Sequence, residues 1–263
     1  MIGLPILHRE KGQNMPKNRT TNAIIYEGPS LIDGGPIVVV AIVSKRNRKT
    51  GDMLQTYIQR ADTNPVEASR LGLDASQCGA CPLRGIANIE KKTGQADKRA
   101  CYVLLGQGPT GVYKTYKAEK YRHAGGHADI AALGAERMVR IGTYGDGAAV
   151  PAYIWDSLLS RATGHTAYTH QSGNCATSFD GSRYMVSADS EQAARAAWLQ
   201  GHRTFRVIAA VDELTSGEIL CPASKEAGMR TQCASCKLCG GASVKAKSIA
   251  IVAHGAGARH LTA

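Results

Sequence analysis

The sequence has few purely apolar aromatic side chains, with two Phe and two Trp in 263 residues against ten Tyr. It also lacks a long apolar run. The longest covers residues 37–43, which is strand length, whereas about 20 apolar residues are needed to cross a bilayer as a helix. The apolar start at residues 1–7 contains Pro5 and has no basic residues before it, unlike a secretory signal. We therefore expect a cytoplasmic protein with no membrane partner.

Low-complexity segments and internal repeats are absent too. Apolar residues make up 43% of the chain and charged residues 20%, which is ordinary for a chain that folds around a core and excludes disorder of the whole. A length of 263 residues suits one large domain. We predict an N-terminal tail over residues 1–36 and a single domain over residues 37–263.

The order of the expected elements favours an α/β fold. Residues 37–60 have the pattern of a hairpin with a basic tip. Beyond it, strands are expected at 138–144, 166–170, 183–188, 204–210 and 249–253, and helices at 112–122, 151–163 and 190–200. This alternation predicts a parallel sheet with helical crossovers, and the number of strands favours a complete or partial (β/α) TIM-like barrel. Two loops rich in cysteine, at 74–101 and 220–241, are expected to bind metal.

Eight cysteines without an export signal indicate metal or redox chemistry rather than disulfides. Four of them follow the pattern C-x11-C-x2-C-x2-C, at Cys221, Cys233, Cys236 and Cys239. Four thiolates so spaced can hold one tetrahedral Zn²⁺ or one [4Fe–4S] cluster. The tight C-x2-C-x2-C triple favours iron–sulfur, because zinc more often uses two separate C-x2-C pairs. Four buried free thiols are the alternative.

The other cysteine group is Cys78, Cys81 and Cys101, which leaves one ligand unaccounted for. Cys175 or a histidine can complete it, or one iron of a cluster stays open to bind a small molecule. Neither group has the C-x3-C-x2-C spacing of conventional S-adenosylmethionine radical enzymes. The alternative for this group is an inert packed set of thiols.

Polar side chains follow the expected strands, where a β/α barrel collects its chemistry. Asp146 follows residues 138–144, His170 and Gln171 follow the next strand, and Asp189 follows the one after. Two carboxylates in one pocket can divide a glycosyl transfer, one attacking or stabilising a cationic sugar and the other moving a proton. The alternative is that Asp189 or Ser190 only caps the helix expected at 190–200.

The basic residues point to a nucleic-acid partner. The chain has 32 Lys and Arg against 21 Asp and Glu, a net charge of +11. Cations gather at the hairpin tip and, among tyrosines, on the helix expected at 112–122: Lys45, Arg46, Arg48, Lys49, Lys114 and Lys117. Lysine and arginine neutralise phosphates and tyrosine stacks on bases, but a solvated basic face is the alternative. Filled thiolate sites would lower the net charge to about +8, so part of the excess can balance thiolates.

The ordered motifs resemble a group of bacteriophage and plasmid proteins of unassigned activity. They are CGACPLRG at 78–85, CY at 101–102, RIGTYGD at 140–146, YTHQ at 168–171, SAD at 187–189, CPA at 221–223 and CASCKLC at 233–239. More distantly, the chain resembles the deazaguanine DNA transglycosylases of phages. That resemblance implies a β/α barrel with a metal site and catalytic aspartates, which exchanges guanine for a deazapurine through a sugar–Asp intermediate. His170 stands where those proteins have Lys.

We therefore expect a base-modifying enzyme acting on nucleic acid, with DNA favoured. In this hypothesis Asp146 is nucleophile or base, Asp189 has the complementary role, and Tyr144, His170 and Gln171 line the base pocket. Two alternatives remain open: an iron–sulfur redox or radical enzyme, and a non-enzymatic DNA-binding or anti-defence protein in which metals only hold the fold.

Overall fold

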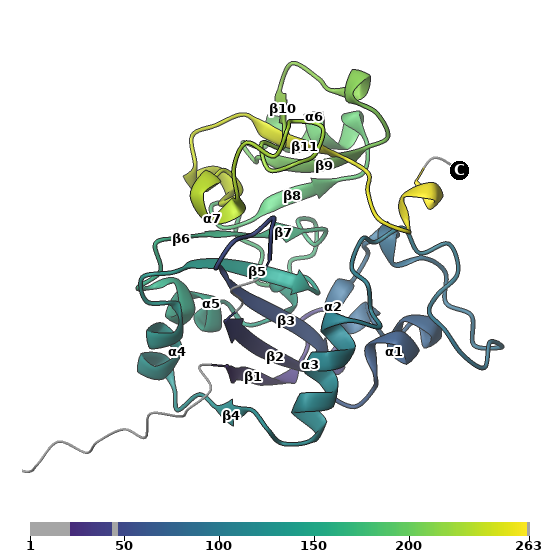
Figure 1. Ribbon diagram of the computed structural model, residues 1–263, viewed down its shortest axis with the longest axis vertical. Helices are drawn as coiled ribbons and strands as arrows, with labels where there is room; N and C mark the ends of the chain where they lie inside the picture. Colours follow the sequence, from purple (N-terminus) through teal and green to yellow (C-terminus); the bar gives the residue numbers. More distant parts are fainter. Residues whose placement is uncertain (1–21, 44–46, 262–263) are drawn as a thin grey trace, which may run out of the picture.

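The computed structural model describes residues 22–43 and 47–261, which form two sheets joined at one edge. The first sheet runs in the order β4 (Arg122–His123), β1 (Ala23–Pro29), β2 (Pro36–Val43), β3 (Leu54–Arg60), β5 (Met138–Tyr144) and β6 (Gly164–Thr166). The β1–β2 and β2–β3 pairs are antiparallel, and the other pairs are parallel. Figure 1 shows this sheet in the lower half of the molecule.

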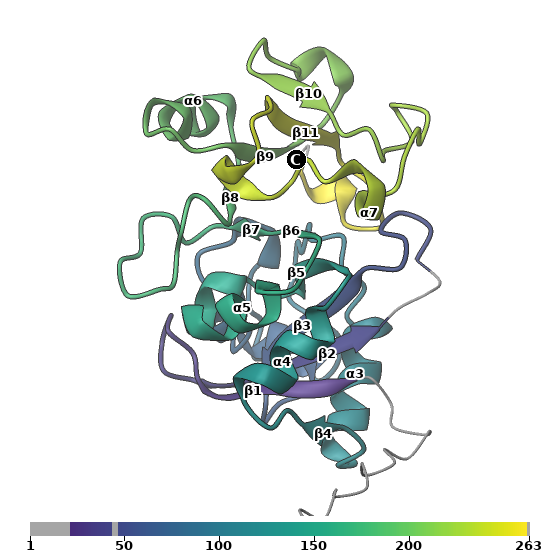
Figure 2. The same cartoon turned by 90° about the vertical axis from the view of Figure 1, so that its left-hand side faces the viewer.

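Helices cover both faces of the first sheet, because successive side chains along its strands point to opposite faces. Ile37, Val39 and Ala41 pack with the core that holds α4 (His127–Gly134) and α5 (Ala152–Leu159). Val38 and Val40 face the other way and contact Val112, which lies on α3 (Gly108–Lys117). Helix α1 (Pro65–Leu71) packs beside α3. Asn64 caps the start of α1 by accepting a hydrogen bond from the Val66 amide. Figure 2 shows α4 and α5 together on one side of this sheet.

The second sheet is entirely parallel. Its order is β10 (Glu218–Leu220), β11 (Ser248–Val252), β9 (Thr204–Ile208), β8 (Met185–Ala188) and β7 (Tyr168–Thr169). Helix α6 (Glu191–Leu199) contacts β8 and β9, and it begins where Ser190 accepts the Ala193 amide at 3.1 Å. The capping role that the sequence left open between Asp189 and Ser190 therefore belongs to Ser190.

Ala167 joins the two sheets. It stands between β6 and β7, donates its amide to the Cys239 carbonyl and accepts the Met185 amide. One nearly continuous segment thus pairs with β5 through its first half and with β8 through its second half. Parallel strands from both sheets end at the same edge, so side chains that follow them meet.

The structure confirms the α/β class and a parallel-rich sheet, but the barrel is not closed within the described residues. The strand order ends at β4 on one side and β10 on the other, and each pairs with a single neighbour. Two antiparallel pairs at the start also depart from a β/α barrel. Among the described residues, none of the helices has the length and apolar character to cross a bilayer.

The expected tail over residues 1–36 is wrong for its last part. Residues 23–29 form β1, whose Ala23, Ile24 and Ile25 are buried in the first sheet. Residues 1–21 lie outside the described part. The hairpin over 37–60 is confirmed as β2 and β3. The expected helix at 112–122 is displaced, since α3 ends at Lys117 and Arg122 lies in β4.

Candidate functional site: a cavity lined by two groups of cysteines

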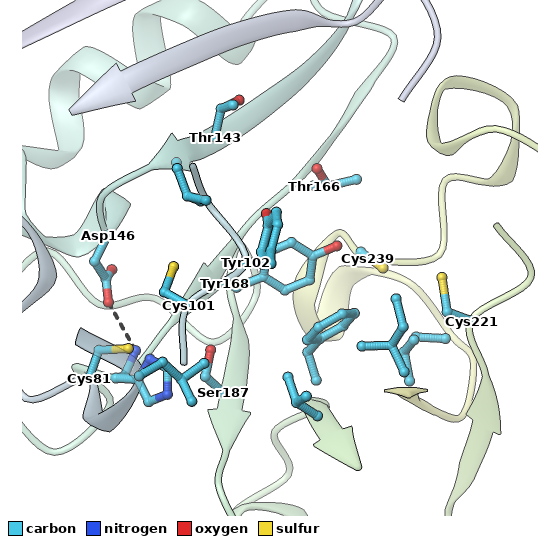
Figure 3. A pocket seen from close by; sticks show the side chains of 18 of the residues that line it. Cys81, Cys101, Tyr102, Thr143, Asp146, Thr166, Tyr168, Ser187, Cys221 and Cys239 are labelled. Carbon is cyan, nitrogen blue, oxygen red and sulfur yellow. Dashed lines mark hydrogen bonds between the residues drawn. The ribbon is translucent and has the colours of Figure 1, made fainter. Parts of the chain in front are cut away.

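One cavity brings together residues from both cysteine-rich loops. It lies against both sheets and has a volume of about 190 Å³. That is room for on the order of ten water molecules, too large for a packing defect. Seven of the eight cysteines line it, all except Cys175, which is exposed. Figure 3 shows Cys81 and Cys101 at one end and Cys221 and Cys239 at the other.

The first cysteine group (Cys78, Cys81 and Cys101) lies at the carboxyl ends of the parallel strands. Cys78 ends α2 (Ala75–Cys78), and Gly79 then turns the chain with φ of +55°. Only glycine suits Gly79, because a Cβ there would come within 2.3 Å of the Gln171 amide group. Arg84 holds the turn by donating to the Gly79 carbonyl at 2.8 Å and to Asp74 Oδ1 at 2.6 Å.

Hydrogen-bond donors point at the sulfurs of the first group. Cys101 accepts hydrogen bonds from the Val103 amide and the Arg99 side chain, and Cys81 accepts one from His170. Burial raises the pKa of Cys78 well above its usual value, and Asp74 and the other two thiols raise it further. Burial also raises the pKa of Cys101, although Arg99 and the Val103 amide oppose this rise. A bound metal ion or cluster would reverse this balance, because coordination deprotonates a thiol.

The second cysteine group (Cys221, Cys233, Cys236 and Cys239) is built by a short helix and a reversal. Cys233 and Cys236 are the ends of α7 (Cys233–Cys236), and Lys237 follows with a left-handed φ of +59°. This reversal returns the chain, so that Cys239 faces the same cavity. Cys221 follows β10 and donates its amide to the Ala250 carbonyl at 2.8 Å.

The sulfurs of the second group also have donors. Ala223 and Leu238 amides donate to Cys221 and Cys236, and the Tyr168 hydroxyl donates to Cys239. Burial raises the pKa of Cys239 to about 12 despite that bond, and the three neighbouring thiols add to the effect. Such N–H and O–H bonds to sulfur stabilise metal-bound thiolates and tune their electronics.

Cations without carboxylate partners stand beside both groups. Arg99 is buried next to Cys101, while Arg140 is buried and Lys49 half-buried beside the second group. None of these three cations forms an ion pair within the described residues. The two other cations of the first group are neutralised, since Arg84 pairs with Asp74 and His170 with Asp189.

The charges of these cations are opposite in sign to those of filled thiolate sites. Three thiolates around a doubly charged ion or cluster carry about −1, and four carry about −2. The first group has Arg99 as a cation without a carboxylate partner, and the second group has Arg140, Lys49 and the buried Arg203, which lies near Cys239. Buried charges need partners. The cations beside each group therefore have the sign that would offset thiolates.

The spacing of the thiols bears on which centre fits. Within the described residues, no three His, Cys, Asp or Glu side chains are arranged to hold a single metal ion. A tetrahedral Zn²⁺ at 2.3 Å from each sulfur needs sulfurs only about 3.8 Å apart. The thiols of each group are nevertheless close enough to raise one another's pKa. The seven thiols thus share one cavity without forming a single-ion site in this part of the chain.

Asp146 lies at the cavity wall as a satisfied carboxylate. Its Oδ1 accepts the Ala148 amide at 3.0 Å, and its Oδ2 accepts the Thr169 hydroxyl and the His170 amide, both at 2.9 Å. Burial raises the pKa of Asp146, and these bonds oppose that rise. A carboxylate that already accepts three hydrogen bonds is poorly placed to attack a substrate.

His170 and Asp189 form a pair that faces the first cysteine group. His170 Nε2 lies 3.1 Å from Asp189 Oδ1. Burial disfavours the charged imidazole, but hydrogen bonds to Asp189 and Cys81 outweigh it and raise the pKa of His170 to about 10. Both residues line the cavity. His170 is also the histidine that this structure brings next to the three-cysteine group.

The two other predicted pocket residues differ in position. Tyr144 lines the cavity, and its hydroxyl accepts Gln77 Nε2 at 3.1 Å. Gln171 is buried outside the lining and donates to the Cys78 carbonyl at 3.3 Å. Gln171 therefore supports the cysteine loop and does not face the cavity.

The predicted phosphate-binding residues do not form one surface. Lys49 lines the cavity beside the second group. Arg48 is exposed at the turn between β2 and β3, where its carbonyl accepts Gln232. Lys114 and Lys117 are exposed on α3, outside the cavity. Lys45 and Arg46 lie outside the described residues.

Sequence reasoning missed the residues that connect the two groups. Arg140 lies over the ring of Tyr168 at 5.7 Å and donates to the Tyr102 hydroxyl at 2.5 Å. Tyr168 donates to Cys239, and Tyr102 follows Cys101. One signal was available in the sequence, because an arginine in the middle of an apolar strand is seldom buried unless it has a partner.

Neither a family model nor a curated protein or solved structure resembles the chain closely enough to count as a match. The function therefore has to be argued from the cavity itself.

Proposed function

We propose that the chain is an iron–sulfur enzyme that carries out redox chemistry on a small molecule bound between its two cysteine groups. One observation carries this proposal: seven thiols line a single cavity in two groups, each beside cations that have no carboxylate partner. Inert packed thiols need neither the cavity nor the cations.

The two groups have different tasks in this proposal. The first supplies three thiolates, so a cluster held there offers one iron with an open position for a small molecule. It lies at the carboxyl ends of the parallel strands, where α/β proteins place their ligands. The second supplies four thiolates, which close the coordination of a cluster and leave it an electron carrier and a structural clamp.

The chain's own residues prepare the first group for such a ligand. Arg84 and Gly79 shape the C-x2-C turn, and Gln171 holds the Cys78 carbonyl. His170 donates to Cys81 while Asp189 keeps the ring oriented and charged. Hydrogen bonds of this kind, made to the ligands and the loop that carries them, raise metal affinity about 10- to 100-fold. Asp189 is half-exposed at the cavity, where it can exchange a proton with a bound substrate.

The test is anaerobic purification followed by iron, sulfide and zinc analysis and by electron paramagnetic resonance of the reduced protein. Two clusters correspond to about eight irons and eight sulfides per chain. Cys81→Ala and Cys236→Ala should each remove about half of the iron, while Cys175→Ala, the matched control outside the cavity, should remove none. Stoichiometric zinc without sulfide, or a metal-free folded protein, would contradict the proposal.

Base exchange on nucleic acid is a second candidate, because Asp146 and Asp189 both line the cavity. Asp189 is the better placed of the two to meet a substrate, since Asp146 already accepts three hydrogen bonds. A base reaching this cavity has to leave the duplex or come from a single strand. Mass spectrometry of nucleosides from expressing cells tests it: a modified base that disappears with Asp189→Asn supports base exchange, and unmodified DNA and RNA from cells with folded protein count against it.

A further inference from the structure

Two cations stand together at one end of the cavity, and within the described residues neither has a carboxylate partner. Arg140 is buried on β5, and Lys49 is half-buried in the turn between β2 and β3. Burial lowers the pKa of Lys49, and the nearby charge of Arg140 lowers it further. Arg140 donates to the Tyr102 hydroxyl at 2.5 Å, which is a neutral acceptor. Because a buried charge needs a counter-charge, this end of the cavity favours an anion.

The carboxylates of the cavity do not supply that counter-charge. Among the described residues, three carboxylates line the cavity, and each already has partners. Asp74 pairs with Arg84, and Asp189 pairs with His170. Asp146 accepts three hydrogen bonds from neighbouring donors. The two cations are therefore free to meet an anion that enters from outside.

The thiols of the second cysteine group do not use up these cations either. Three cations stand beside that group, because the buried Arg203 lies near Cys239 in addition to Arg140 and Lys49. Four thiolates around a doubly charged centre carry about −2. One positive charge is therefore left over when such a centre is bound, and all three are left over when the thiols are protonated.

A buried hydroxyl without a partner lies at the same place. Thr166 on β6 is the register partner of Arg140 on β5, and the side chains of both line the cavity. Thr166 is 1% exposed, and its Oγ1 has no hydrogen-bond partner within the described residues. Figure 3 shows Thr166 in the same part of the cavity as the rings of Tyr102 and Tyr168. Since buried polar groups are normally paired, an open hydroxyl beside two cations indicates a polar ligand.

An apolar wall continues from these cations along the second sheet. Four side chains of β9 and β11 are register partners and line the cavity: Phe205 with Ile249, and Val207 with Ile251. Tyr168 connects this wall to the cations, because the Arg140 guanidinium lies 5.7 Å from the centroid of its ring, and the rings of Tyr168 and Phe205 are 4.4 Å apart. Pockets for small molecules have this composition, an apolar lining with a few polar groups that converge.

We propose that the cavity binds a small organic anion, with its oxyanion group against Arg140, Lys49 and Thr166 and its apolar body along the wall of β9 and β11. A guanidinium matches two oxygens of a carboxylate or a phosphate ester with parallel hydrogen bonds, and an ammonium adds a point charge. The cavity volume of about 190 Å³ has room for one such molecule. This inference goes beyond the proposed redox function, since it needs the cations, the hydroxyl and the wall but no metal.

The experiment titrates the full chain with 4-fluorobenzoate and follows the probe by fluorine NMR. The neutral 4-fluorobenzamide has nearly the same shape and should bind about 10-fold more weakly, because it lacks the charge. Acetate has the charge without the ring and should also bind about 10-fold more weakly, measured by competition. Equal affinity for the acid and the amide, or for the acid and acetate, would overturn the proposal. A parallel titration with 4-fluorophenyl phosphate assigns the preferred oxyanion, a phosphate ester if it binds more tightly and a carboxylate if it does not.

Three variants test the residues. Lys49→Gln removes a half-buried charge without opening the core and should weaken 4-fluorobenzoate binding about 10-fold. Thr166→Val keeps the shape but removes the open hydroxyl, so it should weaken binding about 3-fold without lowering the unfolding temperature. Lys114→Gln, the matched control on α3 outside the cavity, should change binding less than about 2-fold. Binding that Lys49→Gln reduces no more than Lys114→Gln does would overturn the proposal.

Metal analysis separates this inference from the proposed function. The titrations use the folded protein as purified anaerobically and again after chelation, with iron, sulfide and zinc measured in each sample. The cations predict that 4-fluorobenzoate binds in both states, and this result supports the anion site whatever the iron content. Failure to bind in either state overturns the anion site, while the iron and sulfide counts decide the proposed function by themselves.

Discussion

The Thr169 hydroxyl donates a hydrogen bond of 2.9 Å to Oδ2 of Asp146, which joins the ends of two parallel strands. The sequence singled out Asp146 as a nucleophile, but in the structure this carboxylate fastens β5 to β7. Asn in its place would turn an NH₂ group toward backbone and hydroxyl donors. We expect Asp146→Asn to lower the free energy of unfolding by about 2–4 kcal/mol, since it leaves buried donors unpaired.

The matched variant is Asp189→Asn, which also removes a cavity carboxylate. Asp189 is half-exposed, so its pair with His170 should contribute less than about 1 kcal/mol to stability. Urea unfolding of both variants, prepared without metal, measures the difference. Equal losses of stability would refute the structural role assigned to Asp146.

Gly145 also constrains the turn that carries Asp146. Its φ is +85°, and a Cβ there would lie 2.6 Å from the Ile58 carbonyl oxygen. Strain and a backbone clash together should make Gly145→Ala less stable by about 2–4 kcal/mol. Gly106→Ala is the control, because no atom lies within 4 Å of its Cβ. Thermal unfolding should separate the two; a Gly145→Ala protein as stable as the control would show that this turn can relax.

Arg206 on β9 and Glu218 on β10 form a buried ion pair across β11, which lies between these strands, with Arg206 Nη2 and Glu218 Oε2 2.6 Å apart. Burial opposes ionisation of Glu218, but Arg206 and Thr215 outweigh it and lower the pKa of this carboxyl below its usual 4.5. A lowered folded-state pKa means that the pair stabilises the protein above pH 4.5 and loses this effect as pH falls through the folded-state pKa.

Glu218→Gln should therefore cost about 3–5 kcal/mol at pH 7, because it leaves the buried Arg206 charge without its partner. The difference from the unchanged protein should shrink as pH falls below 4.5 and through the lowered folded-state pKa of Glu218, where this carboxyl becomes protonated. Urea unfolding at a series of pH values measures both effects. A difference that stays constant with pH would mean that the pair does not hold its charge.

Metal removal should destabilise the second sheet more than the first. Cys221 and Cys239 belong to the buried cluster beneath that sheet, together with Met185 and Ile249. If a bound cluster completes this region, stripping it should lower the unfolding temperature by about 5–10 °C, because binding energy is then folding energy. Calorimetry before and after chelation measures the shift, and amide exchange should locate it in β8, β9 and β11. An unchanged unfolding temperature would indicate that the thiols are inert.

The elements with clear local signals were predictable. Residues 138–144 form a strand as expected, because Met138, Val139 and Ile141 supply apolar side chains that the strand buries. The C-x2-C and C-x2-C-x2-C spacings indicated which cysteines share a loop. Residues 23–29 were missed, since the mostly apolar segment of β1 is short and becomes a strand only by pairing with β2 and β4.

The contacts of Lys49 and Arg140 could not be predicted from the sequence alone. It determined the chemistry available: seven cysteines at metal-binding spacings, a basic excess and polar residues after strands. Only the tertiary structure decided how these groups meet, because pairing across the two sheets sets which strand ends share an edge. It placed Lys49 beside thiols rather than on an open surface and gave Arg140 a position between Tyr102 and Tyr168. Local pattern carries no information about such distances, since they join chain segments far apart in the sequence, such as Arg140 and Tyr102, which are 38 residues apart.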